Sequence, residues 1–206
     1  MTPADSTRAS GRGEILAVAR RLFMTRGFRA VTTREIADAV GLTQPALYHH
    51  FGGKEALYVA VLKEDLARQS AAIRAVVETD APARERLATL AANAAAQTDH
   101  DLGQMFHDLR FEVSEATREH IGLAFREAMM QPMLGLVDAL VSEGEIAPPE
   151  DAAMSHAEVA MFVLSVIRML KDTNAGPARG PRRSEREIGE MTVRLVLRGV
   201  GSHANP

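Results

Sequence analysis

The stretch TTREIADAVGLTQPALYHHF, residues 32–51, decides the fold of the first part of the chain. A threonine at its start can cap a short helix, on which Ile36 and Val40 recur at the spacing of one buried face. Gly41 supplies a tight turn, and Thr43 can cap a second short helix. Two short helices joined by a glycine turn predict a helix-turn-helix.

The second of these helices begins with short polar and small side chains, which can reach base edges in the major groove of DNA. A glutamine can pair bidentately with adenine, and the methyl groups of threonine or alanine can touch the methyl group of thymine. Polar and basic side chains around this helix are suited to phosphates. The predicted base readers are Thr43, Gln44, Pro45 and Ala46, and the predicted phosphate contacts are Thr33, Arg34, Tyr48, His49 and Lys54.

The charge of the chain is unevenly distributed. Residues 1–60 hold eight Lys and Arg against five Asp and Glu, whereas the rest of the chain holds 16 against 22. The basic first part favours contact with a polyanion, which agrees with a DNA-binding motif there.

The whole chain has the pattern of an all-α protein. Ala, Leu, Glu and Arg dominate, and alternating runs of β-branched residues are missing. We predict a helix-turn-helix DNA-binding domain over residues 1–57 and a larger helical ligand-binding and dimerisation domain over residues 58–206. The helices expected after residue 80 span about 82–98, 101–113, 114–141 with a bend at Pro132, 149–171 and 184–197.

The segments ILAVARRLFMTRGFRAVT, residues 15–32, and TTREIADAVGLTQPALYHHFGGKEAL, residues 32–57, together resemble the signature of the TetR family of bacterial transcriptional regulators. The resemblance is dense over residues 14–57 and elsewhere extends only to length and helical character. It implies contacts of Tyr48, His49 and Lys54 with the DNA backbone. It also implies a homodimer, a helical ligand domain and repression that a ligand relieves.

The helix expected over residues 149–171 is apolar over a wide face, so it must be covered on two sides. Together with the last helix it could form a four-helix interface with a second subunit, although burial within one subunit would also satisfy the pattern. A twofold DNA site favours the homodimer. The predicted interface residues are Phe162, Val166, Met169, Met191 and Leu195.

The middle helices combine methionines and aromatic residues with a few polar side chains. Such surfaces adapt to varied ligands, although a methionine and phenylalanine stripe at helical spacing is more often plain core. We expect a small, mainly apolar effector here. The predicted ligand residues are His100, Gln104, Phe106, His107, Phe111, Phe125, Met129 and Met133.

Several kinds of protein are disfavoured by the sequence. The chain has no cysteine, which excludes disulfides and cysteine-ligated zinc. No glycine-rich phosphate loop, nucleophile elbow or zinc-protease motif indicates an enzyme. We expect no metal, no cofactor and no membrane span, and a cytoplasmic location. The favoured function is a dimeric repressor that a small molecule releases from its operator. The alternative is a DNA-binding regulator controlled by a protein partner, or acting without a ligand.

Overall fold

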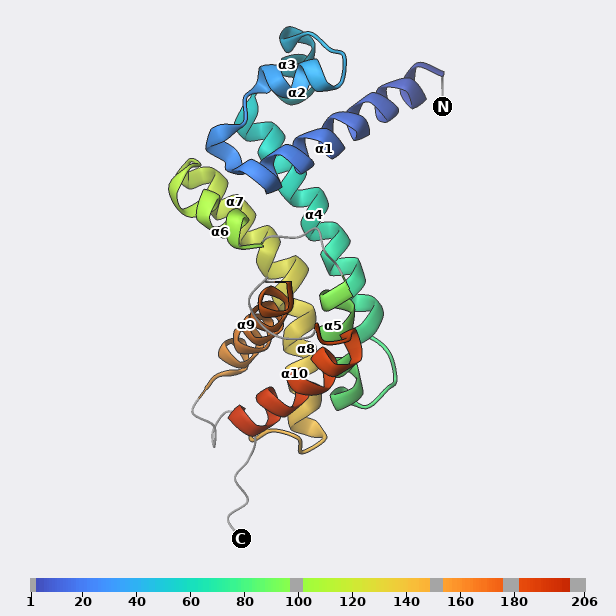
Figure 1. Cartoon of the computed structure of the whole chain (residues 1–206), viewed down its shortest axis with the longest axis vertical. Helices are drawn as coiled ribbons and strands as arrows, with labels where there is room; N and C mark the ends of the chain where they lie inside the picture. Colours follow the sequence, from blue (N-terminus) through green and yellow to red (C-terminus); the bar gives the residue numbers. More distant parts are fainter. Residues whose placement is uncertain (1–2, 97–101, 149–153, 176–181, 201–206) are drawn as a thin grey trace. The chain divides into compact units, whose positions relative to one another are not determined.

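The computed structural model describes residues 3–96, 102–148, 154–175 and 182–200, and every regular element in these ranges is helical (Figure 1). The helices form two compact units. One unit comprises residues 1–67 and 100–125, and the other comprises residues 68–99 and 126–206. The predicted all-α class is therefore confirmed.

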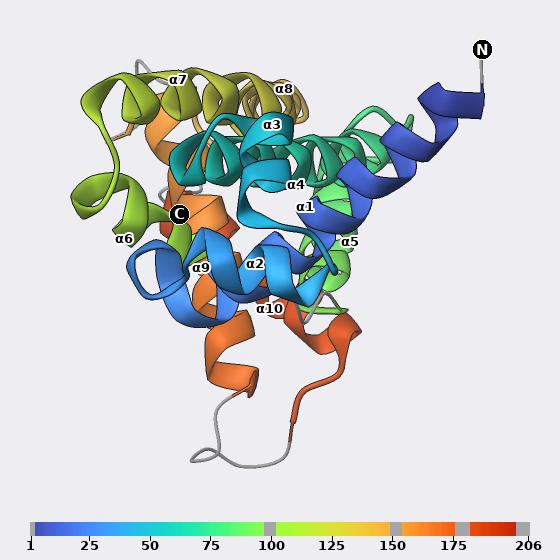
Figure 2. The same cartoon turned by 90° about the horizontal axis from the view of Figure 1, so that it is seen from above.

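The first unit contains the helix-turn-helix. Its helices are α1 (Pro3–Ala30), α2 (Thr33–Ala39), α3 (Gln44–Phe51), the first part of α4 (Lys54–Val77), α6 (Leu102–Phe111) and α7 (Glu115–Phe125). Figure 2 shows α2 and α3 as two short helices joined by a turn. Helix α1 is kinked at Gly27, with φ 77° and ψ 163°. Glycine suits this backbone because side chains with a Cβ strongly disfavour it.

The helix-turn-helix is supported by a small apolar core. Ile36 on α2 is buried, as the sequence pattern predicted, whereas Val40 is half-buried. Leu47 on α3 is buried as well. Beneath them Phe23 of α1 and Tyr58 of α4 are completely buried, and their rings meet edge to face with centroids 5.0 Å apart. This geometry is one of the favourable arrangements of aromatic pairs. Helix α2 packs against both α1 and α3.

A buried carboxylate joins α6 to the same unit. Asp108 accepts a hydrogen bond of 2.9 Å from the backbone N–H of Phe28 and one of 3.0 Å from the hydroxyl of Tyr58. Burial, and the negative charge of Asp108, raise the pKa of the Tyr58 phenol, so the hydroxyl keeps its proton. The first compact unit therefore includes residues 100–125, in addition to the N-terminal segment for which the sequence predicted a domain ending at residue 57.

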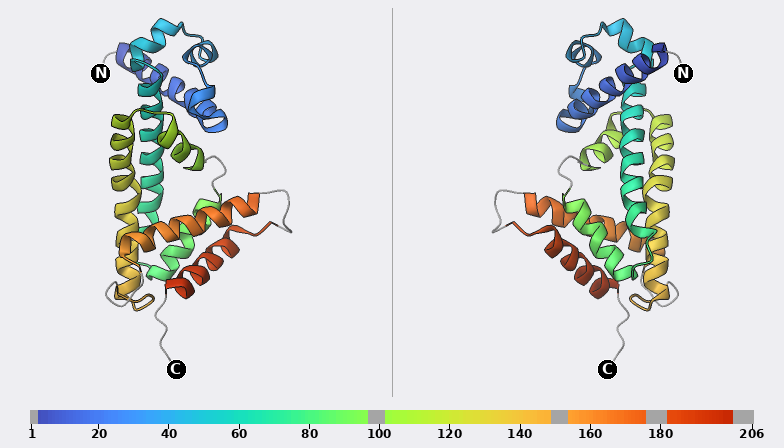
Figure 3. Two further views of the ribbon diagram at one scale, coloured as in Figure 1. Left: turned by 90° about the vertical axis from the view of Figure 1, so that its left-hand side faces the viewer. Right: turned by 90° about the vertical axis from the view of Figure 1, so that its right-hand side faces the viewer.

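The second unit is built from the last part of α4, α5 (Ala83–Ala96), α8 (Gln131–Ser142), α9 (His156–Ala175) and α10 (Glu185–Val200). Figure 3 shows α9 and α10 side by side, with α5 beside them. Gly189 allows α10 to approach α5 closely, because a Cβ at this position would lie 2.5 Å from the carbonyl oxygen of Ala88. Helix α9 begins later than predicted, at a capping box in which Ser155 and Glu158 exchange hydrogen bonds.

The predicted helix over 114–141 is interrupted. A π-helical turn, η1 (Arg126–Met130), lies between α7 and α8, directly before Pro132. Proline cannot donate a backbone hydrogen bond, so a departure from regular α-helix next to it is expected. In the parts of the chain that the structure describes, no helix is long and apolar enough to cross a membrane.

Candidate DNA-binding site

The first helix of the motif is fixed by an N-terminal capping box. Thr32 caps α2 by accepting a hydrogen bond from the backbone N–H of Glu35, and the Glu35 carboxylate accepts one of 2.7 Å from the N–H of Thr32. The carboxylate of Glu35 accepts hydrogen bonds from the N–H and the hydroxyl of Thr32, and these bonds, together with the guanidinium of Arg26 3.0 Å away, lower the pKa of Glu35. Thr32 is therefore the threonine that caps α2, which leaves Thr33 free for another role.

The second helix presents a polar face. Thr43 caps α3 by accepting a hydrogen bond from the N–H of Ala46, and Gly52 ends the helix in the left-handed conformation. Leu47 and Phe51 are buried, so the remaining side chains of α3 face away from the core. The exposed residues of α3 are Gln44, Pro45, Tyr48, His49 and His50.

Two residues predicted to contact DNA are hydrogen-bonded to each other. The side-chain amide nitrogen of Gln44 donates to the hydroxyl oxygen of Thr33 over 2.8 Å. Thr33 is buried, with 6% of its surface exposed, while Gln44 is exposed. The first residue of α2 and the first residue of α3 are thus joined at the position where the motif would face the bases.

The other predicted phosphate contacts differ in their surroundings. Tyr48 is 43% exposed, and Arg34 extends from α2 with Asp38 3.9 Å away. The amine of Lys54 lies 4.3 Å from the ring centroid of Phe28 and 3.4 Å from the carbonyl oxygen of Arg29. Partial burial lowers the pKa of Lys54, and nearby carboxylates oppose this shift. Lys54 is therefore positioned by the turn that follows the kink in α1.

Sequence reasoning missed part of this site. The contacts of Lys54 with Phe28 and of Gln44 with Thr33 join residues 26 and 11 positions apart, and periodicity gives no sign of either contact. Asp108 and Phe28 are 80 positions apart, and Asp108 lies in a helix that we assigned to the ligand domain. The capping box of α2, in contrast to these contacts, has a signal in the sequence, because a threonine is followed three residues later by a glutamate.

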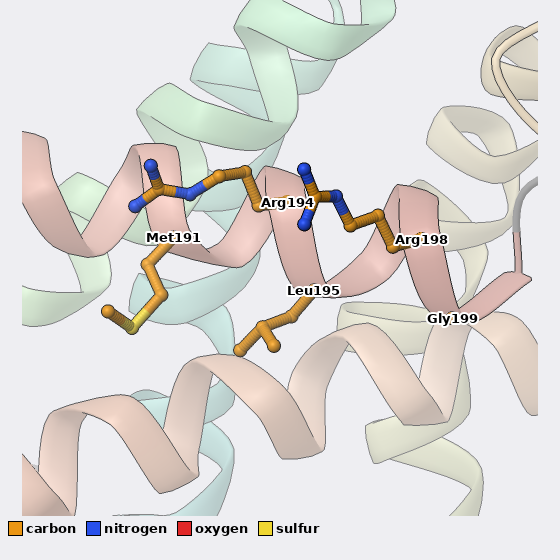
Figure 4. A pocket seen from close by; sticks show the side chains of 5 residues that line it. All are labelled: Met191, Arg194, Leu195, Arg198 and Gly199. Carbon is orange, nitrogen blue, oxygen red and sulfur yellow. The ribbon is translucent and has the colours of Figure 1, made fainter.

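The residues predicted for a dimer interface lie on α9 and α10. Met169 and Leu195 are exposed, and Phe162 and Met191 are half-buried. Val166, in contrast, is buried with Leu170 and Ile188 inside the unit. A surface pocket of about 500 Å³ on α10 is lined by Met191, Arg194, Leu195, Arg198 and Gly199. Figure 4 shows Met191 and Leu195 extending to a different side of α10 from the two arginines.

The residues predicted for ligand binding are divided between the units. His107 and Phe111 lie on α6 with ring centroids 5.1 Å apart, and Phe111 is 64% exposed. Met129 of η1 and Met133 of α8 are buried in the second unit. Phe125, at the end of α7, is half-buried. His100 lies outside the described residues, and Gln104 and Phe106 lie on α6 with side chains that the structure does not describe.

Among the residues that the structure describes, no group of three or more histidine and carboxylate side chains is placed to bind a metal ion.

The fold and this site define a helix-turn-helix DNA-binding protein. A family model described as bacterial regulatory proteins, tetR family, matches residues 15–61. The chain is 30% identical over 215 residues to the HTH-type transcriptional repressor KstR2 of Rhodococcus jostii strain RHA1, with 98% of each chain covered. The chain therefore belongs to the TetR family, as the sequence resemblance predicted, and its relatives are transcriptional regulators rather than enzymes.

Solved structures show the same fold. The structure of the ketosteroid transcriptional regulator KstR2 of Mycobacterium tuberculosis is similar with a TM-score of 0.66 and 25% identity, covering 93% of this chain and 95% of that one. AibR, solved in complex with isovaleryl coenzyme A and operator DNA, is similar with a TM-score of 0.69 and 19% identity, covering 90% and 97%.

Proposed function

We propose that this TetR-family regulator is a homodimeric repressor, which binds its operator through α3 and is released by a small, mainly apolar ligand. The observation that carries this proposal is the exposed face of α3, where Gln44, Tyr48 and His49 stand above a core formed by Leu47 and Phe51. In this proposal Gln44, with Thr43, Pro45 and Ala46, faces the bases. Arg34, Tyr48, His49 and Lys54 bind phosphates.

The surface of α9 and α10 supports the homodimer. Met161, Met169 and Leu195 are large apolar side chains that are exposed in the single chain, and a second copy could cover them. The first half of α10 exposes mainly acidic side chains, which are Glu185, Glu187 and Glu190. The second half exposes the basic side chains of Arg194 and Arg198. An antiparallel pair of α10 helices would place opposite charges against each other.

The π-helical turn supports a ligand site near Met129 and Met133. Such turns are rare and occur frequently at functional sites. Methionines are flexible and polarizable, so they adapt to apolar ligands of different shapes. We place the effector against these two methionines of the second unit. The assignment of His100, Gln104, Phe106, His107, Phe111 and Phe125 to ligand binding stays a separate prediction from the sequence. The two neighbouring folds suggest which compounds to test, since one is a ketosteroid regulator and the other was solved with an acyl coenzyme A.

Release would follow from a difference in ligand affinity between two conformations of the dimer, one of which fits the operator. The chain passes from the first unit to the second within α4, so α4 is the element through which we expect a ligand to act. A repressor of this kind acts on chromosomal DNA, which places it in the bacterial cytoplasm.

The test uses an operator selected from genomic DNA fragments by the full-length protein. Ketosteroids and acyl coenzyme A thioesters, including isovaleryl coenzyme A, are then titrated against the complex while its dissociation is followed by fluorescence anisotropy. We expect one compound class to lower the DNA affinity at least tenfold, and Met129→Ala or Phe111→Ala to reduce that response. If the protein binds its operator and no compound changes its affinity for that DNA, release by a small ligand is refuted. The protein would then be controlled by a protein partner or would act without a ligand.

A further inference from the structure

The contact between Thr33 and Gln44 has a consequence for base recognition. Gln44 is the residue best suited to read a base, and its amide nitrogen donates to the hydroxyl of Thr33 over 2.8 Å. The amide has two N–H groups and an oxygen. One N–H of the Gln44 amide is bonded to Thr33, so the other N–H and the amide oxygen remain available. These are the two groups that a bidentate contact with adenine requires.

We propose that Thr33 is a positioning residue for base reading, which holds Gln44 ready for DNA instead of binding a phosphate itself. The proposal rests on the proposed function, in which Gln44 faces the bases. A free glutamine rotates about three side-chain bonds, and fixing such a side chain on binding weakens affinity by about 2- to 12-fold. A glutamine already fixed in the free protein avoids most of this loss.

Thr33 is well suited to hold another side chain. It is buried, so water cannot easily replace the hydroxyl as the partner of Gln44. Its β-branched side chain has few rotamers, which keeps the hydroxyl in one place. Thr33 is also free for this role because Thr32 caps α2.

The test compares five full-length proteins: wild type, Thr33→Val, Thr33→Ser, Gln44→Ala and the double variant Thr33→Val with Gln44→Ala. The wild type selects a preferred duplex from a random library, and dissociation constants are then measured for that duplex and for each single base-pair variant. Thr33→Val keeps the shape of threonine without the hydroxyl, and Thr33→Ser keeps the hydroxyl. Circular dichroism and thermal unfolding check that each protein is folded.

We expect Thr33→Val to lose discrimination about 2- to 12-fold at the same base pair where Gln44→Ala loses it, with unchanged binding to non-specific duplex. Thr33→Ser should discriminate as the wild type does. The double variant Thr33→Val with Gln44→Ala should be no worse than Gln44→Ala alone, because both changes remove one contact.

Two results would overturn the positioning role. One is full discrimination by Thr33→Val at the base pair that depends on Gln44. The other is an equal loss on all duplexes with a smaller salt dependence, which would make Thr33 a phosphate contact. If Thr33→Val does not fold, Thr33→Ala takes its place, with Thr33→Ser as the rescue. If Gln44→Ala leaves every base preference unchanged, base reading by Gln44 fails instead.

Discussion

The helix-turn-helix and the surface of α9 and α10 expose different kinds of side chain. On α3 the exposed side chains other than Pro45 are polar, and two buried residues of that helix, Leu47 and Phe51, fix it to the unit. On α9 and α10 large apolar side chains such as Met169 and Leu195 are exposed beside charged ones. A polar face is suited to DNA and its hydration, whereas an apolar face is suited to a protein surface. The difference agrees with the two proposed roles, base reading on α3 and dimer formation on α9 and α10.

The largest expected effect comes from the apolar surface. Leu195→Glu places a charge in the proposed dimer interface, so the protein should become monomeric. Operator affinity should then fall on the order of 100- to 10,000-fold, because two linked reading helices are replaced by one. Sedimentation and anisotropy measure both quantities. Leu123→Glu, on an exposed leucine of α7, is the matched control and should change neither. A dimer that persists in Leu195→Glu would refute the interface.

The second prediction concerns packing inside the second unit. Gly189→Ala should lower the free energy of unfolding by about 1–3 kcal/mol, because the new Cβ meets the backbone of Ala88. Gly135→Ala, in α8 of the same unit, meets nothing within 4 Å and should raise it by about 0.5–1 kcal/mol. Urea unfolding measures both. Equal effects of the two substitutions would mean that the α5–α10 approach is not tight.

The third prediction separates phosphate binding from base reading. Lys54→Gln should weaken binding by a similar factor on every duplex and reduce the slope of log K against log salt by about 1. The reason is the loss of one cation at the DNA backbone. Lys63→Gln changes an exposed lysine farther along α4 and should leave the slope unchanged. A loss confined to particular base pairs in Lys54→Gln would contradict the division between phosphate and base contacts.

The smallest expected effect concerns acid stability. Glu55 accepts hydrogen bonds from the N–H and the hydroxyl of Ser114, and these bonds lower the pKa of the Glu55 carboxyl. The stabilisation is therefore complete above the ordinary pKa of glutamate, and it decreases as the pH falls through the lower pKa of the folded state. Glu55→Gln should remove less than about 1 kcal/mol of stability at pH 7, since the group is partly exposed.

The check on that prediction is the free energy of unfolding between pH 7 and pH 3. Glu55→Gln should flatten its dependence on pH at the acid end, and Glu119→Gln, an exposed glutamate of α7, should not. An unchanged acid limb in Glu55→Gln would show that the contact with Ser114 adds nothing to stability.

The same comparison explains what could be predicted from the sequence. Residues of the helix-turn-helix are neighbours along the chain, so a threonine cap for each short helix and the buried Ile36 followed from spacing alone. Contacts between distant segments did not follow. The hydrogen bonds of Asp108 to Phe28 and Tyr58 connect three helices, and no periodic pattern records them.

Val166 shows the same limit on the apolar helices. The hydrophobic stripe of α9 marks residues that must be covered, yet it does not say whether the cover comes from the same chain or from another one. In the structure Val166 is covered by Leu170 and Ile188 of its own unit, while Met169 on the same helix is exposed. The dimer surface is therefore best tested at exposed positions such as Leu195.

The central claim is that α3 reads a base sequence. The most direct measurement is the dissociation constant of the full-length protein for its selected operator and for a duplex of the same length and composition in shuffled order, at one salt concentration. We predict binding to the operator that is tighter by about 10³-fold or more, and a loss of about 1–3 kcal/mol of discrimination at one base pair in Gln44→Ala. Equal affinity for the two duplexes would contradict the claim.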